Sequence, residues 1–211
     1  MDFYEAVMAR RTIRDFEDRI IPGDILERII GAGLQAPTND HMREWEFIIL
    51  NDKTERLEAI HYVPKDLSVD ESTAIIDKWG LTDECQRAMY LIGIPKQYRM
   101  LLNAGCLILP AFRHRGTLLK PESLSALNSF ASVWCCIENM LLAAAAESIF
   151  GIVRIPFEEE THHLKATLGV PDGYEIPCYL ALGYPAKELP ATRQIQVDIK
   201  DRMHHGRWQC R

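Results

Sequence analysis

The sequence predicts a single domain of α/β or α+β class, in which helices pack on a β-sheet. Short apolar runs of strand length alternate along the chain with amphipathic segments of helical spacing, and no internal repeat breaks this order. The 211 residues suffice for a substantial core, and the hydrophobic fraction of 47% is ordinary for a globular protein. We therefore expect one domain spanning 1–211, with a helical excursion at about 61–103.

The first half of the chain predicts helices around one short strand. In order, we expect a short helix at 3–8, a helix N-capped by Asp24 that closes before Pro37, a strand at 47–50, and a brief helix N-capped by Asp52. Residues 61–103 hold prolines and glycines among short amphipathic pieces. We interpret them as a helical excursion from the main layer and a candidate lid.

The second half predicts most of the sheet and one long helix. In order, we expect a strand at 106–112 halted by Pro110, a helix at 123–147, a strand at 151–155, a helix closing at Gly169, and a strand at 178–184. The helix at 123–147 is apolar nearly all round, which indicates burial in a core or a subunit interface. Ile195, Val197 and Ile199 alternate with polar residues, as in an edge or exchanged strand.

The composition argues against several partners and sites. A net charge of −6 gives no general attraction to nucleic acid or to anionic membranes. No apolar run approaches the roughly 20 residues of a membrane span, and the N-terminus lacks a signal-peptide core. The six cysteines lack CxxC spacing, and the histidines form no HxxxH or HExxH motif. We expect a cytoplasmic protein without disulfides or metal, and no nucleic-acid or membrane partner.

An arginine cluster near the N-terminus is the first candidate site. Arg10, Arg11 and Arg14 lie within five residues, and Thr12 adds a hydroxyl group. Guanidinium groups bind phosphate oxygens in a bidentate manner and stay charged at physiological pH. Alternatively, arginines after a helix satisfy its last carbonyl groups and the negative end of its dipole. By itself the cluster favours the second interpretation.

The segment APTNDH (36–41) is the second candidate site. Thr38 and Asn39 are short hydrogen-bonding residues suited to a polar ring edge or a ribityl chain, although Asn and Asp after a proline also simply make turns. The sequence has no GxSxG, GxGxxG or GxxxxGK[ST] motif. This argues against a serine hydrolase of the α/β type, a dinucleotide-binding Rossmann domain and a Walker-type NTPase.

An ordered set of segments gives these candidates a common interpretation. RRTIRDF (10–16) is followed by an IP-initiated helix at 21–29, APTNDHMREWEFIIL (36–50), IENMLLAAAAES (137–148), LGVPDGYEIPCYLALGYPA (168–186) and HHGRW (204–208). In this order, the segments resemble the FMN-dependent nitroreductase family over nearly the whole chain outside 61–103. The resemblance implies an α+β fold with a central, mostly antiparallel sheet flanked by helices. It also implies a domain-swapped homodimer with FMN at the subunit interface.

The resemblance also assigns roles to residues. Arg10, Arg11, Thr12 and Arg14 would bind the FMN phosphate and flavin edge, and Pro37, Thr38, Asn39 and His41 would line the flavin from the partner subunit. Arg154, Ile155 and Pro156 fall where backbone amides of the family meet the flavin, but Pro156 has no N–H. The C-terminal phosphate arginine is Arg193 or Arg207, between which the spacing does not decide. Residues 41–44 and 148–156 depart from the family pattern, so we do not expect these contacts to carry over unchanged.

The implied activity is an oxidoreductase reaction. NADH or NADPH would reduce FMN, and a nitroaromatic, quinone or similar small electron-poor acceptor would then take the hydride in a ping-pong cycle. The flavin carries this chemistry, so no catalytic acid or base is expected from the protein. Two alternatives stay open: a flavin-binding storage or sensing protein of the same fold, and an unrelated α/β interaction domain whose arginines only cap a helix.

Overall fold

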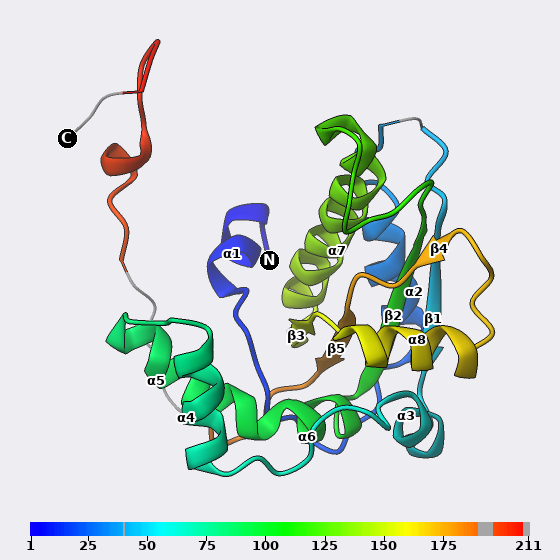
Figure 1. Ribbon diagram of the computed structural model, residues 1–211, viewed down its shortest axis with the longest axis vertical. Coiled ribbons are helices and arrows are strands. Elements are labelled where there is room, and N and C mark those ends of the chain that lie inside the picture. The colour runs from blue at the N-terminus through cyan, green and yellow to red at the C-terminus, as the bar shows by residue number, and fades with distance from the viewer. Residues whose placement is uncertain (40, 190–195, 209–211) are drawn as a thin grey trace.

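A five-stranded antiparallel sheet forms the centre of the protein. The computed structural model describes residues 1–39, 41–189 and 196–208 (Figure 1). The strands are β1 (Trp45–Leu50), β2 (Cys106–Arg113), β3 (Phe150–Arg154), β4 (Tyr174–Glu175) and β5 (Tyr179–Gly183). Their order is β1-β2-β5-β3, and β4 pairs with the end of β2. The predicted α+β class and antiparallel sheet are therefore confirmed.

Helices cover both faces of this sheet. The helices α2 (Gly23–Gly33) and α7 (Asn128–Ala146) pack on one face, and α3 (Lys53–Ala59), α6 (Gln97–Leu102) and α8 (Glu158–Thr167) pack on the other. Strand β2 shows why two cores form. Ile108 and Phe112 belong to the core beside α7, whereas Leu107 and Leu109 belong to the opposite core, because successive strand residues point to opposite faces.

The excursion at 61–103 contains further helices outside these layers. They are α4 (Val69–Lys78), α5 (Glu84–Gly93) and the 3₁₀ turn η1 (Ile94–Lys96), which leads into α6. Ser68 caps α4 in a capping box, and Asp83 caps α5. The two helices are joined by an ion pair of 2.7 Å between Arg87 and Asp77. In Figure 1 they lie beside the lower end of the sheet rather than over either face.

Helix α7 is the longest helix of the described residues. With the preceding 3₁₀ turn η2 (Leu124–Leu127), it is long and apolar enough to cross a membrane by length and composition alone. The core helix of a soluble protein passes the same test. One face of the helix packs in the core, where Cys136 and Met140 are fully buried, and 33% of the apolar window is buried in all. A Cβ atom on Gly33 of α2 would lie 2.6 Å from Cγ of Met140, which shows how closely the two helices approach.

Three local predictions were wrong. Strand β2 continues through Pro110, which pairs with Phe47 of β1. On the other side of β2 the ladder skips residues 109–111, so the strand has room for a residue without an N–H. Asp24 does not cap α2; Pro22 holds the N-cap position, and Asp24 forms a 3.0 Å ion pair with Arg28 instead.

The predicted strand at 195–199 is the third correction. Ile195 lies outside the described residues, and residues 196–198 belong to no strand. Ile199 begins the 3₁₀ turn η3 (Ile199–Arg202), which Asp198 caps by accepting a hydrogen bond from the Lys200 N–H. The alternation of three apolar residues was too short to distinguish a strand from an exposed extended segment.

Candidate functional site

The arginine segment lies along the edge of the sheet beside β3. The Ile13 N–H donates to the Gly151 carbonyl at 3.1 Å, and Thr12 forms a parallel bridge with Gly151. Strand β3 thus contacts the arginine segment along one edge and pairs closely with β5 along the other. A Cβ atom on Gly151 would lie 2.1 Å from the Ala181 carbonyl oxygen. The segment thus follows the short helix α1 (Phe3–Ala9) and is held in place by backbone contacts.

Each arginine of the cluster has a different environment. Arg10 lies 3.6 Å from the Glu138 carboxylate of α7, and the Arg11 guanidinium lies 5.0 Å from the centre of the Phe150 ring. Arg14 packs against α5, since a Cβ atom on Gly93 would lie 3.1 Å from its Nε. Burial lowers the pKa of Arg14. Within the described part of the chain, Arg11 and Arg14 make no hydrogen bond or ion pair.

These contacts distinguish the two interpretations of the cluster. No side chain of the cluster donates to the last carbonyl groups of α1 within the described residues, so the contacts do not support the helix-capping interpretation. The neighbouring Asp15 carboxylate acts on Arg14 but is already paired with Lys96 at 2.6 Å, so the partly buried guanidinium has no acceptor of its own. The arrangement around Arg14 can therefore hold an anion such as a phosphate group.

Arg154 is the last residue of β3, the strand that the arginine segment contacts, and its guanidinium is already paired. Arg154 is buried and binds both carboxylate oxygens of Glu160, with 2.7 Å between Nη2 and Oε1, and its Nε donates to Gln97 at 3.1 Å. Ile155 is 64% exposed, and Pro156 is half-buried. The Arg154 guanidinium is thus not free for a cofactor, and this segment offers backbone and the Ile155 side chain instead.

The second candidate site lies at the other end of α7. Asn39 accepts a hydrogen bond of 3.1 Å from Asn128, the first residue of α7, while Pro37 and His41 are exposed. The Arg43 Nε donates to the Leu34 carbonyl at 2.9 Å, which fixes the loop to the end of α2.

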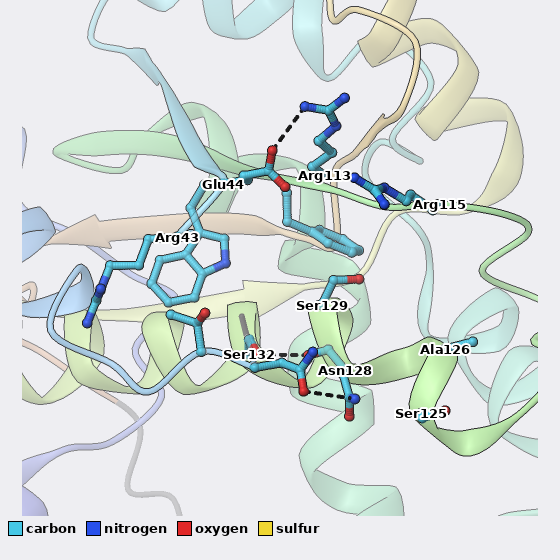
Figure 2. A pocket seen from close by; sticks show the side chains of 13 residues that line it. Arg43, Glu44, Arg113, Arg115, Ser125, Ala126, Asn128, Ser129 and Ser132 are labelled. Atoms are coloured by element: carbon cyan, nitrogen blue, oxygen red, sulfur yellow. Dashed lines mark hydrogen bonds and ion pairs between the residues drawn. The ribbon is translucent and has the colours of Figure 1, made fainter. Parts of the chain in front are cut away.

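A pocket of about 270 Å³ opens beside this loop (Figure 2). It is lined by Thr38, Asn39, Arg43, Glu44, Trp45, Phe112, Arg113, Arg115, Ser125, Ala126, Asn128, Ser129 and Ser132.

One chain does not bring the two candidate sites together. Asn128 at the pocket and Glu138 beside Arg10 lie ten positions apart on α7, which corresponds to about 15 Å along a helix. Arg207 is exposed in the C-terminal segment, and Arg193 lies outside the described residues. The sequence predictions did not include Arg113, Arg115 and the serines of the pocket. The two arginines had one signal, the basic run RHR at 113–115, and the serines had none.

The fold defines the class of the protein. An antiparallel sheet between helical layers is also the architecture of oxidized iodotyrosine deiodinase bound to FMN and 3-iodo-L-tyrosine. That structure superposes with a TM-score of 0.73 at 15% identity, over 98% of this chain and 100% of that chain. Nitroreductase A of Vibrio parahaemolyticus superposes with a TM-score of 0.72 at 15% identity, over 100% of this chain and 78% of that chain, so the fold is nitroreductase-like.

The sequence comparisons identify the family. The profile of the Nitroreductase family matches residues 7–184. The chain therefore belongs to this family, and the resemblance noted in the sequence is confirmed.

Two relatives align over most of their length. An NADH dehydrogenase of Thermus thermophilus is 25% identical over 201 residues, covering 94% of each chain. An iodotyrosine deiodinase of Nematostella vectensis is 22% identical over 204 residues, covering 96% of this chain and 74% of the relative.

Proposed function

We propose that the protein is an FMN-dependent oxidoreductase that uses NADH or NADPH to reduce nitroaromatic, quinone or similar small electron-poor acceptors. The single observation that carries this proposal is Arg14, a partly buried guanidinium beside the β3 edge without an acceptor in the described chain. The names of the relatives support it, because they include an NADH dehydrogenase and deiodinases, one of which was solved with FMN.

The residues of the arginine segment fit the cofactor. Arg11 and Arg14 would bind its phosphate and the electron-rich edge of its ring, and the Thr12 hydroxyl would add a hydrogen bond. Bound FMN would supply the transfer of a hydride from the nicotinamide to the acceptor. For a nitro group, the hydride and one proton give a nitroso group and water, while the nicotinamide leaves oxidised.

We further propose that the protein is a homodimer with two shared sites. Helix α1 exposes Phe3 (65%), Tyr4 (78%) and Met8 (85%), and the C-terminal segment exposes Trp208 (79%). Exposed apolar groups gathered in this way mark an interaction surface. In Figure 1 the C-terminal segment extends away from the sheet, and α1 lies beside α7. In a two-fold dimer, the Thr38–Asn39 loop of each subunit would reach the arginine segment of its partner. This arrangement accounts for the separation of the two sites in one chain.

The first test is the colour and redox behaviour of the purified protein. It should be yellow, with absorbance near ~450 nm that NADH or NADPH bleaches and that 1,4-benzoquinone or a nitroaromatic restores. Stopped-flow reduction with each nicotinamide would give the donor preference. Colourless protein that takes up no added FMN would contradict the proposal.

One observation favours a second function. The Arg154 guanidinium binds Glu160, and Pro156 lacks an N–H, in the segment where the family holds the flavin through backbone amides. A flavin-binding storage or sensing protein of the same fold would tolerate these changes. It would bind FMN yet oxidise NAD(P)H negligibly with every quinone and nitro compound, so rapid turnover with any of them rejects this alternative.

A further inference from the structure

The pocket at the start of α7 is more basic than the chain around it. Its charged lining residues are Arg43, Arg113, Arg115 and Glu44, so three cations face one anion in a protein of net charge −6. Glu44 is already paired with Arg113 at 2.9 Å. The pocket therefore has positive charge that no carboxylate of its own lining neutralises.

Arg115 is the arginine of the pocket whose guanidinium is available to a ligand. Arg43 donates hydrogen bonds to the Leu34 and His41 carbonyl groups, and Figure 2 shows the Arg113 guanidinium turned toward Glu44. Arg115 makes no hydrogen bond or ion pair with any described residue. An arginine in this state can bind a carboxylate with two parallel hydrogen bonds at little cost in competing contacts.

The other walls of the pocket suit a flat aromatic ring. Trp45 and Phe112 are buried cross-strand partners on β1 and β2, and both line the pocket. Hydroxyl and amide groups, including Ser129 and Asn128 of α7, complete the rim. The volume of about 270 Å³ is below the range of about 300–1,000 Å³ typical of drug-sized ligands. The space therefore favours a single substituted ring.

We propose that this pocket binds small aromatic carboxylates, with Arg115 as the partner of the carboxylate group. As a statement about binding, the proposal stands on the pocket alone. As a statement about turnover it rests on the proposed function, and it then names the preferred acceptors as aromatic acids. The Thr38–Asn39 loop links the two, because it lines this pocket and is the loop assigned to the flavin of the partner subunit.

The experiment compares 4-nitrobenzoate with 4-nitrobenzamide, which share ring and nitro group but differ in charge. Calorimetric titration of the full-length protein should show the acid binding at least about tenfold more tightly than the amide, and the KM ratio should follow. In Arg115→Gln both ratios should fall to about one, and Arg115→Lys should restore part of the preference. The matched control is Arg99→Gln, which removes an exposed arginine of α6 that pairs with Asp66 and should keep the wild-type ratios.

The outcomes separate the two proposals. Equal binding of acid and amide by the wild-type protein overturns the aromatic-acid pocket, whatever the activity. So does an Arg115→Gln protein that keeps the preference, or one that loses FMN, since the pocket would then serve the cofactor. Calorimetric preference for the acid, without turnover of either compound or of any quinone by flavin-loaded protein, supports the pocket and contradicts the proposed reductase function.

Discussion

At the scale of single residues, Arg154 lies in a buried cluster of charged and polar groups beside β5. Its guanidinium binds Glu160 and lies 5.5 Å from the centre of the Tyr179 ring. The Tyr179 hydroxyl is buried without a hydrogen-bond partner in the described chain. Burial, and then the negative charge of Glu160, raises the pKa of Tyr179 well above its usual value.

This cluster predicts a loss of stability at high pH. Above about pH 10 the tyrosine of the unfolded chain loses its proton while the folded protein retains it, so the free energy of unfolding falls as pH rises. Burial also raises the pKa of the Cys106 and Cys136 thiols to about 12, which acts in the same direction. Urea unfolding followed from pH 8 to pH 11 should show this decline.

Tyr179→Phe is the control for that decline. It removes a hydroxyl that has no hydrogen-bond partner among the described residues, so stability at pH 7 should change by less than about 1 kcal/mol. The loss between pH 9 and pH 11 should become smaller. A loss as steep as that of the wild-type protein would show that Tyr179 does not contribute to it.

Arg14 gives the prediction most directly tied to the cofactor. Arg14→Gln keeps much of the side-chain volume but removes the charge, so FMN should bind roughly 10- to 100-fold more weakly, as measured by fluorescence quenching during titration. Arg99→Gln, on the exposed surface, serves as the control. Unchanged FMN affinity in Arg14→Gln would favour a purely structural role for the cluster.

The same residues show how far the sequence could predict the site. The ordered motifs located the arginine segment and the 36–41 loop, because the order and spacing of these segments can be read from the sequence alone. Whether a given arginine is free or committed depends on groups distant in sequence, such as Gln97 for Arg154 and Gly93 for Arg14. Arg115 carries no motif, so only the folded pocket revealed it.

At the scale of elements, apolar runs predicted the main strands and helices well, and their boundaries less well. Helix α3 begins after Asp52, which accepts a hydrogen bond from the Thr54 N–H as predicted. The prediction that Pro110 halts β2 was wrong because the cost of a proline depends on whether a neighbouring strand needs its N–H. That information lies in the sheet, not in the local sequence.

The contact between α2 and α7 predicts opposite effects for two glycines of one helix. Gly31 has open space around its Cα, so Gly31→Ala should stabilise the protein by about 0.5–1 kcal/mol through helix propensity. A Cβ atom on Gly33 would meet Met140 and the Cys136 sulfur, so Gly33→Ala should destabilise it by about 1–3 kcal/mol. Urea unfolding of both variants checks the pair. Equal effects would contradict the close packing.

At the scale of the whole molecule, the proposed dimer predicts that the C-terminal segment controls assembly. Ile199 (70% exposed) and Trp208 (79% exposed) would be buried against the partner, so Ile199→Asp with Trp208→Asp should shift the protein toward monomer and weaken FMN binding. Light scattering coupled to size-exclusion chromatography measures the shift. Leu119→Asp, at a position 85% exposed outside this segment, should stay dimeric. A dimeric double variant would argue against an exchanged segment.

The arginine segment and the Thr38–Asn39 loop lie apart along α7 in one chain, and this separation has a genetic consequence. If each complete site draws its arginines from one subunit and its Thr38–Asn39 loop from the other, a defect in either half disables both sites of a homodimer. A mixed dimer of one Arg14→Gln subunit and one subunit with a disrupted loop would collect both defects in one site and leave the other intact. Co-expression of two inactive alleles should therefore restore up to about half of the activity per mixed dimer. If each site were instead built from one chain alone, both subunits would stay defective and co-expression would restore no activity.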